Sequence, residues 1–377
     1  MTAASAPFNL WRFLRSGTGW PYVLVPFIPI AIVLDAIGAD PTIVFFASAL
    51  GVVPTAALMG KATEELAHRS GPGIGGLLNV TFGNAPELII AIFALNSGLQ
   101  EVVKASIIGS ILGNLLLVMG AAMLIGGWGR ERQKFVAEAA SAQATLLLLA
   151  AVALLLPAMF LLSTGGHLPG LESEATRFST DIEKMSLGVS IVLLLSYAGG
   201  LWFSLKTHKD VFNPEMGNQD VPHGTWSVKR SVTALALAGV AVGYMSEILV
   251  GSIEEASAGI GLSPFFVSLI IVAIVGNAGQ HWVAVYFAAR DKVDLSISIA
   301  IGSSAQIALF VMPVLVLLSF VIGPFPLSLE FSGLEIGAIL LAVLIAAHVT
   351  QEGESTWFEG LQLLAVYVVL GIVFFFV

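Results

Sequence analysis

Two short polar motifs interrupt long apolar stretches of the sequence, and their residue types are those that bind hard cations. Gly83-Asn84-Ala85-Pro86-Glu87 and Gly276-Asn277-Ala278-Gly279-Gln280 lie 193 positions apart. Each places an amide three residues before a second oxygen-bearing side chain, so that both project from nearly one face of a helix. Pro86 also lacks a backbone donor, which disrupts the helix and frees carbonyl oxygens. We predict a cluster of one carboxylate, three side-chain amides and free carbonyl groups.

Glu87 determines the chemistry of this predicted cluster. A carboxylate in the middle of an apolar span costs free energy and is usually functional. Ca²⁺ takes about six to eight oxygen ligands, and the absence of cysteine excludes thiolate metal sites. Burial favours the protonated carboxyl group, whereas a bound cation favours the ionised one. Glu87 can therefore hold either a cation or a proton, and we predict Glu87, Asn84, Asn277 and Gln280 as cation ligands. A Glu87 that is merely hydrogen-bonded within the bundle is the alternative.

Further polar residues are candidates for lining an ion path or its two mouths. The candidates for the path or its mouths are Ser110, Ser303, Gln306, His281, Glu64 and Glu255. Glu64 and Glu255 would attract cations, and His281 would gate the path or shuttle protons, since its unperturbed pKa lies near neutrality. Interhelical hydrogen bonds, solvated helix ends and simple packing are the corresponding alternatives. Gly109 and Gly113 form a GxxxG pattern, which fits close helix packing as readily as function.

The composition requires a membrane around these motifs. Of 377 residues, 57% are hydrophobic and only 11% are charged, whereas a soluble domain carries about a quarter charged. This excludes a soluble enzyme, a nucleic-acid binder and a disordered scaffold. We predict an all-α polytopic membrane protein with about eleven spans of roughly 20 residues each. The expected spans are 21–38, 42–63, 73–96, 103–126, 136–162, 185–205, 231–252, 264–288, 294–322, 333–350 and 359–377.

The basic residues orient these spans. With a cytoplasmic N-terminus, 13 of the 16 Lys and Arg residues fall on the cytoplasmic side, as the positive-inside rule expects. Those residues are Arg12, Arg15, Lys61, Arg69, Arg130, Arg132, Lys134, Lys206, Lys209, Lys229, Arg230, Arg290 and Lys292. Only Lys104, Arg177 and Lys184 fall on the other side. The N-terminus is expected inside and the C-terminus outside.

The paired motifs indicate two inverted repeats. Gly109-Ser110 and Gly302-Ser303 share the 193-residue offset of the Gly-Asn-Ala motifs. We expect an N-terminal lead-in and first helix over 1–40, a first five-helix repeat over 41–206, a cytoplasmic linker over 207–230 and a second five-helix repeat over 231–377. Because each repeat has an odd number of helices, the second is inverted relative to the first. Inverted repeats with broken helices at the midplane are typical of secondary transporters.

Longer stretches around these motifs resemble the cation/proton exchanger (CAX) family of the calcium/cation antiporter superfamily. The matching segments are Gly60–Ala67, Gly71–Gly76, Asn79–Glu87, Ser246–Glu255, Val272–His281 and Gly302–Phe310. The resemblance implies an eleven-helix exchanger that moves Ca²⁺ against protons, exporting Ca²⁺ in bacterial members. It assigns the central site to the acidic residue of each Gly-Asn-Ala motif, a role that Glu87 fills in the first repeat.

The second repeat departs from the family pattern. Gln280 stands where the family typically has a glutamate before a histidine. Glutamine keeps an oxygen ligand but carries neither charge nor an exchangeable proton. A transport-impaired form, whether natural or engineered, and a natural variant of altered selectivity or stoichiometry therefore both stay open.

The functional expectation is an antiporter exchanging Ca²⁺ for H⁺, with Ca²⁺ as transported ion and no cofactor. A monovalent Na⁺ or K⁺/H⁺ antiporter is the nearest alternative, because it suits a site of single negative charge. A passive channel, a membrane-embedded hydrolase and a lipid- or partner-binding scaffold are more distant ones. The lipid bilayer is the expected surrounding, nucleic acid is not an expected partner, and no pattern indicates an oligomer. We expect a prokaryotic cytoplasmic (inner) membrane, with an organellar membrane as the alternative.

Overall fold

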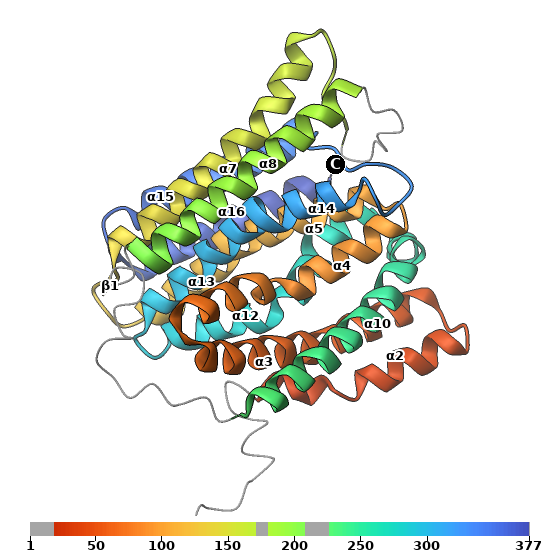
Figure 1. Ribbon diagram of the computed structural model, residues 1–377, viewed down its shortest axis with the longest axis horizontal. Helices are drawn as coiled ribbons and strands as arrows, with labels where there is room; N and C mark the ends of the chain where they lie inside the picture. Colours follow the sequence, from red (N-terminus) through yellow and green to blue (C-terminus); the bar gives the residue numbers. More distant parts are fainter. Residues whose placement is uncertain (1–18, 171–179, 208–225, 377) are drawn as a thin grey trace, which may run out of the picture.

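The protein is a bundle of long helices, seen in a computed structural model that describes residues 19–170, 180–207 and 226–376 (Figure 1). The expected N-terminal lead-in, most of the 207–230 linker, and the basic residues Arg12, Arg15, Arg177 and Lys209 lie largely or wholly outside the described residues. The only strands among the described residues are two-residue segments, β1 (Gln133–Lys134) and β2 (Glu354–Ser355), which pair antiparallel. The all-α expectation is therefore confirmed apart from this short pairing.

Many of the helices follow one another directly or after a few residues. Their bounds in the first half are η1 (Trp20–Leu24), α2 (Phe27–Ala36), α3 (Pro41–Gly83), α4 (Ala85–Asn96), α5 (Gln100–Leu112), η2 (Gly113–Val118), α6 (Met119–Gly127), α7 (Ala137–Ser163), α8 (Thr180–Trp202) and η3 (Phe203–Thr207). Those in the second half are α10 (Val228–Ile260), α11 (Pro264–Val267), η5 (Ser268–Val272), α12 (Ala273–Ala288), α13 (Val293–Gln306), η6 (Ile307–Val311), α14 (Met312–Leu318), α15 (Gly333–Thr350) and α16 (Trp357–Phe375).

Helix α3 turns back on itself. Ala57 lies 3.6 Å from the Cβ position of Gly279, while the Gly83 carbonyl oxygen accepts a hydrogen bond from the next residue, Gln280. In a straight helix, residues 57 and 83 would be about 39 Å apart. The reversal is visible where α3 leads back toward α4 (Figure 1). The first limb of α3, which holds Gly51 and Met59, packs along α10 at Met245 and Gly239. Its second limb ends at Gly83, beside Gln280.

The loops gather at two opposite ends of the bundle. At one end, Arg130 bonds Asp291 at 2.6 Å and Arg132 bonds Glu354 at 2.7 Å. The Arg132 guanidinium holds the pKa of the half-buried Glu354 carboxyl below its usual range. At the other end, Gln100 donates to the Phe325 carbonyl oxygen at 2.8 Å. These contacts group the loops 128–136, 289–294 and 351–356 at one end and the turns 97–100 and 323–332 at the other.

This grouping fixes the relative directions of two helices. α4 leads from the middle of the bundle toward the end that holds Gln100, whereas α12 leads toward the end that holds Asp291. The two Gly-Asn-Ala motifs therefore run in opposite directions, as the sequence predicts for an inverted pair.

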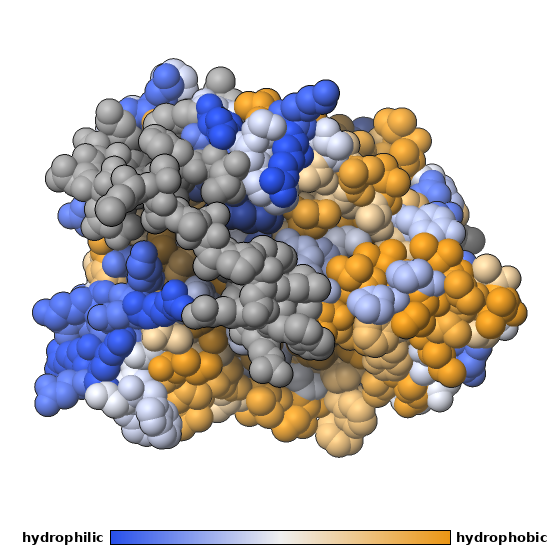
Figure 2. All heavy atoms as spheres, turned by 90° about the horizontal axis from the view of Figure 1, so that it is seen from below, coloured by the Kyte–Doolittle hydropathy of each residue, from blue (hydrophilic) through white to orange (hydrophobic). Residues whose placement is uncertain are grey.

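The outer surface has the character of a protein in lipid. Large apolar side chains point outward from α7, α8, α10, α15 and α16, and Figure 2 shows apolar side chains spread over a broad part of one face. Among the described residues, nine helices are long and apolar enough to cross a membrane, and two shorter apolar helices are Trp20–Ala36 and Ala85–Asn96. An integral membrane fold is confirmed, while the count of eleven spans stays a prediction.

Gly109 shows how closely the helices pack. A Cβ at this position would overlap the Leu269 carbonyl oxygen and lie 2.8 Å from the Cβ of Ala273. The GxxxG pattern therefore serves, at Gly109, the close approach of α5 to η5 and α12.

We expect Gly109→Ala to lower the free energy of unfolding by about 1–3 kcal/mol through overpacking, measured by thermal unfolding of the purified protein in detergent.

Gly337→Ala is the matched control for this prediction. Gly337 also lies inside a helix, but apart from the backbone of that helix and its two chain neighbours no atom lies within 4 Å of its Cβ position. Its replacement should leave the melting temperature unchanged or raise it slightly, because alanine is the better helix former. Equal melting temperatures for the two variants would contradict the assignment of Gly109 to packing.

Candidate cation-binding site

The site begins at a break in the chain at Asn84. The backbone there leaves helical geometry (φ −106°, ψ 25°), and α4 starts with Pro86 in its first turn. Proline fits a first turn because its missing N–H would be unpaired there in any case. Asn84 is buried, so the break places its amide and the neighbouring carbonyl groups inside the bundle rather than in solvent.

Local π-helical turns mark the two helices that face this break. η2 follows directly after α5, and η6 follows directly after α13. Both lie just beyond the paired serines, Ser110 and Ser303. Such turns are uncommon and occur frequently at functional sites, because the extra residue per turn changes which side chains face inward. The two halves of the chain thus carry the same local distortion at matched positions.

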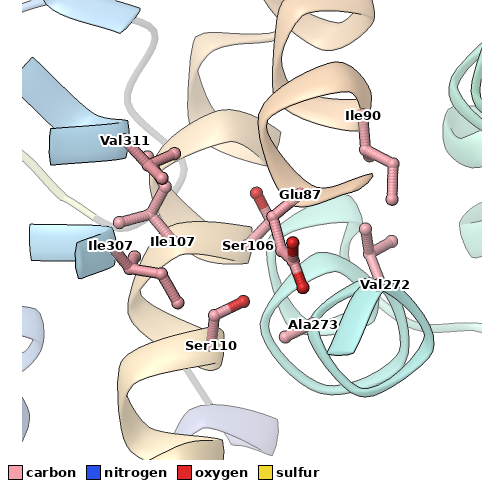
Figure 3. A pocket seen from close by; sticks show the side chains of 10 residues that line it. Glu87, Ile90, Ser106, Ile107, Ser110, Val272, Ala273, Ile307 and Val311 are labelled. Atoms are coloured by element: carbon pink, nitrogen blue, oxygen red, sulfur yellow. The ribbon is translucent and has the colours of Figure 1, made fainter. Parts of the chain in front are cut away.

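Glu87 projects into a narrow pocket between α4, α5, η5, α12 and η6. The pocket is tight: the space in it for the centre of a water-sized sphere is about 10 Å³, roughly what one water molecule needs. Its lining residues are Glu87, Ile90, Ser106, Ile107, Ser110, Val272, Ala273, Gly276, Ile307 and Val311. Figure 3 shows the carboxylate of Glu87 between Ser110 and Val272, with Ala273 below it. Its Oε2 atom is buried and has no hydrogen-bond partner among the described residues. A buried acceptor of this kind is costly unless a ligand or a proton completes it.

Asn277 adds a second unpaired oxygen beside this pocket. Its amide nitrogen donates to the Ser110 hydroxyl and to the Ala273 carbonyl oxygen, both at 2.9 Å. These bonds occupy the nitrogen of Asn277, while its Oδ1 atom is buried without a partner in the described part of the chain. A carboxylate oxygen, an amide oxygen and a serine hydroxyl thus meet where α4, α5 and α12 come together.

Asn84 and Gln280 belong to an adjoining network of hydrogen bonds. Asn84 donates to Gln306 Oε1 at 2.7 Å. Gln280 donates through its Nε2 to the Gly83 carbonyl oxygen at 2.5 Å and to Asn84 Oδ1 at 3.4 Å. Its Oε1 accepts from the Ser303 hydroxyl at 2.8 Å. Every polar atom of the Gln280 side chain is therefore in contact with a partner.

His281 and Asn114 form a separate polar pair. His281 Nε2 lies 3.0 Å from Asn114 Oδ1, and the amide nitrogen of Asn114 is buried without a partner among the described residues. The pair sits one residue beyond Gln280 on α12 and at the second residue of η2. It is close to the site without being part of the pocket that holds Glu87.

The expected mouth residues lie away from this centre. Glu64 is exposed and pairs with Lys61 at 3.0 Å, and Glu255 is exposed on α10. The structure thus brings together Glu87, Asn277 and Ser110 in one cluster, and Asn84, Gln280, Gln306 and Ser303 in the adjoining one. Among the described residues, no three His, Asp or Glu side chains come together as a metal site. Any cation here would rely on amide, hydroxyl and carbonyl oxygens beside a single carboxylate.

Sequence reasoning did not find the apolar wall of the pocket. Ile90, Ile107, Val272, Ile307 and Val311 line it, but apolar residues fill every span and carry no distinguishing signal. The sequence predicts the Gly83 carbonyl oxygen only as one of several freed carbonyl groups. It does not predict that this oxygen accepts a hydrogen bond from the Gln280 amide.

Known proteins are similar to this chain in sequence and in fold. The family profile described as sodium/calcium exchanger protein matches residues 41–206 and 230–376. The chain belongs to the sodium/calcium exchanger family. A Ca²⁺/H⁺ antiporter of Aphanothece halophytica is 41% identical over 371 residues, covering 94% of this chain and 95% of the relative. The Ca²⁺/H⁺ antiporter ChaA of Bacillus subtilis is 39% identical, covering 92% and 96%.

Solved structures of exchangers agree with the fold. The structure of native YfkE superposes with a TM-score of 0.79 at 36% identity, covering 95% of this chain and 100% of YfkE. The crystal structure of an H⁺/Ca²⁺ exchanger, CAX, superposes with a TM-score of 0.69 at 16% identity, covering 96% and 93%. At that identity the second match speaks for the fold alone. The family profile, the relatives at 39–41% identity and the match to YfkE together confirm the resemblance to the cation/proton exchangers.

The hydrogen bond between Ser303 and Gln280 makes a testable link between α13 and α12. In a double-mutant cycle with Ser303→Ala and Gln280→Leu, we expect a coupling energy of about 0.5–1.5 kcal/mol, the net value of one such bond. Unfolding of the four proteins in detergent measures it.

Ser304→Ala is the matched control for the cycle, because the Ser304 hydroxyl bonds the Ala300 carbonyl oxygen within its own helix. Its coupling to Gln280→Leu should be near zero. A coupling as large as that of Ser303 would show that the cycle measures general packing rather than the hydrogen bond.

Proposed function

We propose that this chain is a secondary active antiporter that exchanges Ca²⁺ for H⁺, with Glu87 as the shared binding group. One observation carries the assignment of Glu87: one oxygen of its carboxylate has no hydrogen-bond partner among the residues that the structure describes, and it lies in a pocket where two oppositely directed helices meet. The relatives named as Ca²⁺/H⁺ antiporters, which match over nearly the full chain, support the substrates. The chain is a transporter in a membrane, as its relatives are.

The exchange follows from two competing states of Glu87. When it is ionised, its carboxylate provides the negative charge that a cation needs in an apolar surrounding, and Asn277 Oδ1 and the Ser110 hydroxyl supply neutral oxygens nearby. When it is protonated, the group is neutral and the cation has no charged ligand. Cation and proton therefore exclude each other, which is the condition for exchange rather than cotransport.

Asn84 and Gln280 complete the proposed ligand set from the second cluster. Their side chains meet at the helix break, where Gly83 also presents its carbonyl oxygen. A cation reaching these oxygens would displace the amide of Gln280 from Gly83. Ser303 and Gln306 hold the two amides in place from α13, and His281 with Asn114 borders the site. We assign Glu64 and Glu255 to the attraction of cations at the two mouths, in line with their exposure.

The proposed orientation has the N-terminus in the cytoplasm. The distribution of basic residues along the sequence favours it. In this orientation the end with Arg130, Arg132 and Lys134 faces the cytoplasm, and the inner membrane of a prokaryote is the proposed location. Two five-helix repeats over 41–206 and 231–377, joined by the 207–230 linker and preceded by the helix in 1–40, are the proposed organisation.

A monovalent cation/H⁺ antiporter is the second candidate function. One observation favours it: Gln280 leaves the two motifs with a single carboxylate, which balances one positive charge but not two. Ca²⁺ at this site would keep one uncompensated charge. Competition by Na⁺ and K⁺ against Ca²⁺, measured as cation-driven proton movement in proteoliposomes, distinguishes the two candidates.

Glu87→Gln tests the proposed function directly. The amide keeps the size of the side chain but holds neither a cation charge nor a transferable proton, so we expect Ca²⁺-driven proton movement to fall to the level of protein-free vesicles. Ca²⁺ efflux and internal pH, followed by fluorescent indicators in the same proteoliposomes, measure the loss.

Glu138→Gln is the matched control, because it makes the same chemical change at an exposed residue in the first turn of α7. Its exchange rate should equal that of the unchanged protein. Undiminished exchange in Glu87→Gln would refute the assignment of Glu87.

A further inference from the structure

Gln280 occupies in the second half of the chain the position that Glu87 occupies in the first. Both lie three residues after the asparagine of a Gly-Asn-Ala motif, at the shared offset of 193 residues. They also lie on oppositely directed helices, α4 and α12, that contact each other. The two halves of the chain therefore contribute matching helix segments to the site, but only the first half contributes a charged side chain.

The hydrogen bonds of Gln280 are those of a carboxyl group that never loses its proton. Its Nε2 donates to the Gly83 carbonyl oxygen at 2.5 Å, as the O–H of a protonated glutamate would, and its Oε1 accepts from Ser303 at 2.8 Å. An ionised carboxylate has no donor for Gly83 and would face that carbonyl oxygen with a second negative group. Gln280 thus keeps its half of the site permanently in the proton-loaded arrangement.

Among the described residues, no other titratable group lines the pocket of Glu87. Its lining residues from α5, η5, α12 and η6 are apolar residues, serines and glycine, and α14 consists of apolar residues. The charged side chains of the first limb of α3 lie between Lys61 and Arg69, where Lys61 bonds both Glu64 and Glu65. On α5, Lys104 is held by the Glu330 carbonyl oxygen at 2.7 Å, and Glu101 directly follows Gln100 in the first turn of that helix, at the end that holds the 323–332 turn.

The remaining titratable groups of the neighbouring helices also point elsewhere. On α10, Tyr244, Glu247, Glu254 and Glu255 are exposed, and Lys229 and Arg230 lie in its first turn. On α12, His281 contacts Asn114 and Tyr286 stacks on Arg290. In the part of the chain that the structure describes, the exchange must therefore be carried by one carboxylate.

We infer that this chain exchanges one proton per Ca²⁺ and that each cycle moves one net positive charge across the membrane. The inference rests on the proposed function and adds its coupling ratio. The cation-loaded site carries Ca²⁺ with one ionised Glu87, a net charge of plus one, and the return state carries a neutral, protonated Glu87. One Ca²⁺ leaves in one direction and one proton returns in the other, so charge balance leaves one elementary charge transferred in the direction of Ca²⁺.

This coupling makes the Ca²⁺ distribution depend on voltage. At equilibrium the Ca²⁺ ratio across the membrane should change tenfold per unit of pH difference, and tenfold per about 59 mV of membrane potential. An interior-negative potential opposes Ca²⁺ export, because positive charge must leave a negative compartment. A site with two titratable carboxylates would instead return two protons, giving a hundredfold change per pH unit and no dependence on voltage.

The experiment measures the Ca²⁺ ratio at which net flux stops. Proteoliposomes containing the full chain are prepared with a fixed pH difference, and K⁺ gradients with valinomycin set the potential at zero and at two negative values. Ca²⁺ indicators inside the vesicles give the direction of flux for a series of external Ca²⁺ concentrations. Three proteins are compared: the unchanged chain, Gln280→Glu, and the double variant E87Q/Q280E.

The double variant is the matched control, since it moves the single carboxylate to the other half of the site without changing its composition. The unchanged chain and the double variant should both show a tenfold shift of the null ratio per about 59 mV. Gln280→Glu alone should show no voltage shift and a hundredfold change per pH unit. We also expect it to transport Ca²⁺ faster, since its second carboxylate neutralises the bound cation.

Two outcomes would overturn the inference, and they differ from each other. A voltage-independent null ratio in the unchanged chain would refute the one-proton coupling while leaving Ca²⁺/H⁺ exchange intact. An unchanged chain without Ca²⁺ flux at any potential or pH difference would refute the proposed function, and the coupling ratio with it. If the double variant fails to transport, the comparison of the unchanged chain with Gln280→Glu still decides between the two coupling ratios.

Discussion

An ionisable group inside an apolar bundle is the constraint on which the rest of this structure depends. Glu87 lies among isoleucine and valine side chains, and one of its oxygens has no partner in the described part of the chain. Taking a charge out of water costs several kcal/mol even after relaxation, so the group is stable only when a proton or a cation completes it. The apolar wall is therefore part of the mechanism, because it removes water as a third way of satisfying the carboxylate.

The backbone arrangement follows from the same constraint. Oxygen ligands inside a membrane must come from side chains or from carbonyl groups that a regular helix would keep for itself. The break at Asn84 leaves the Gly83 carbonyl oxygen available in this way, and the π-helical turns η2 and η6 lie at matched positions of the two halves. Close helix contacts, such as that of Gly109 with the Leu269 carbonyl oxygen, keep this irregular region enclosed by protein. The loops at both ends, tied by Arg130–Asp291 and Gln100–Phe325, hold the helices that carry it.

Much of this could be read from the sequence because the signals are strong and local. Apolar length predicts the spans, and the paired motifs predict that Asn84, Asn277 and Gln280 meet near Glu87. The sequence could not predict which oxygens stay unpaired. Asn277 contacts Ser110, whereas Asn84 contacts Gln306 rather than Ser303, its partner by internal symmetry. These choices depend on small differences in helix position, and so does the direction in which the Gln280 amide faces. The reversal within α3 agrees with the expected change of direction between the spans 42–63 and 73–96, but the sequence does not predict that the backbone stays helical through it.

The asymmetry between Glu87 and Gln280 is best understood as a balance between two electrostatic costs. Two carboxylates on these facing helices would repel each other whenever the site held neither cation nor protons, and that repulsion would favour protonation of one of them. Gln280 removes the repulsion and gives the empty site a full set of hydrogen bonds on its own side. The same substitution leaves a bound divalent cation with half of the compensating charge. The site therefore gains stability when empty and loses affinity when loaded, and both effects act at the position where the two Gly-Asn-Ala motifs differ in charge.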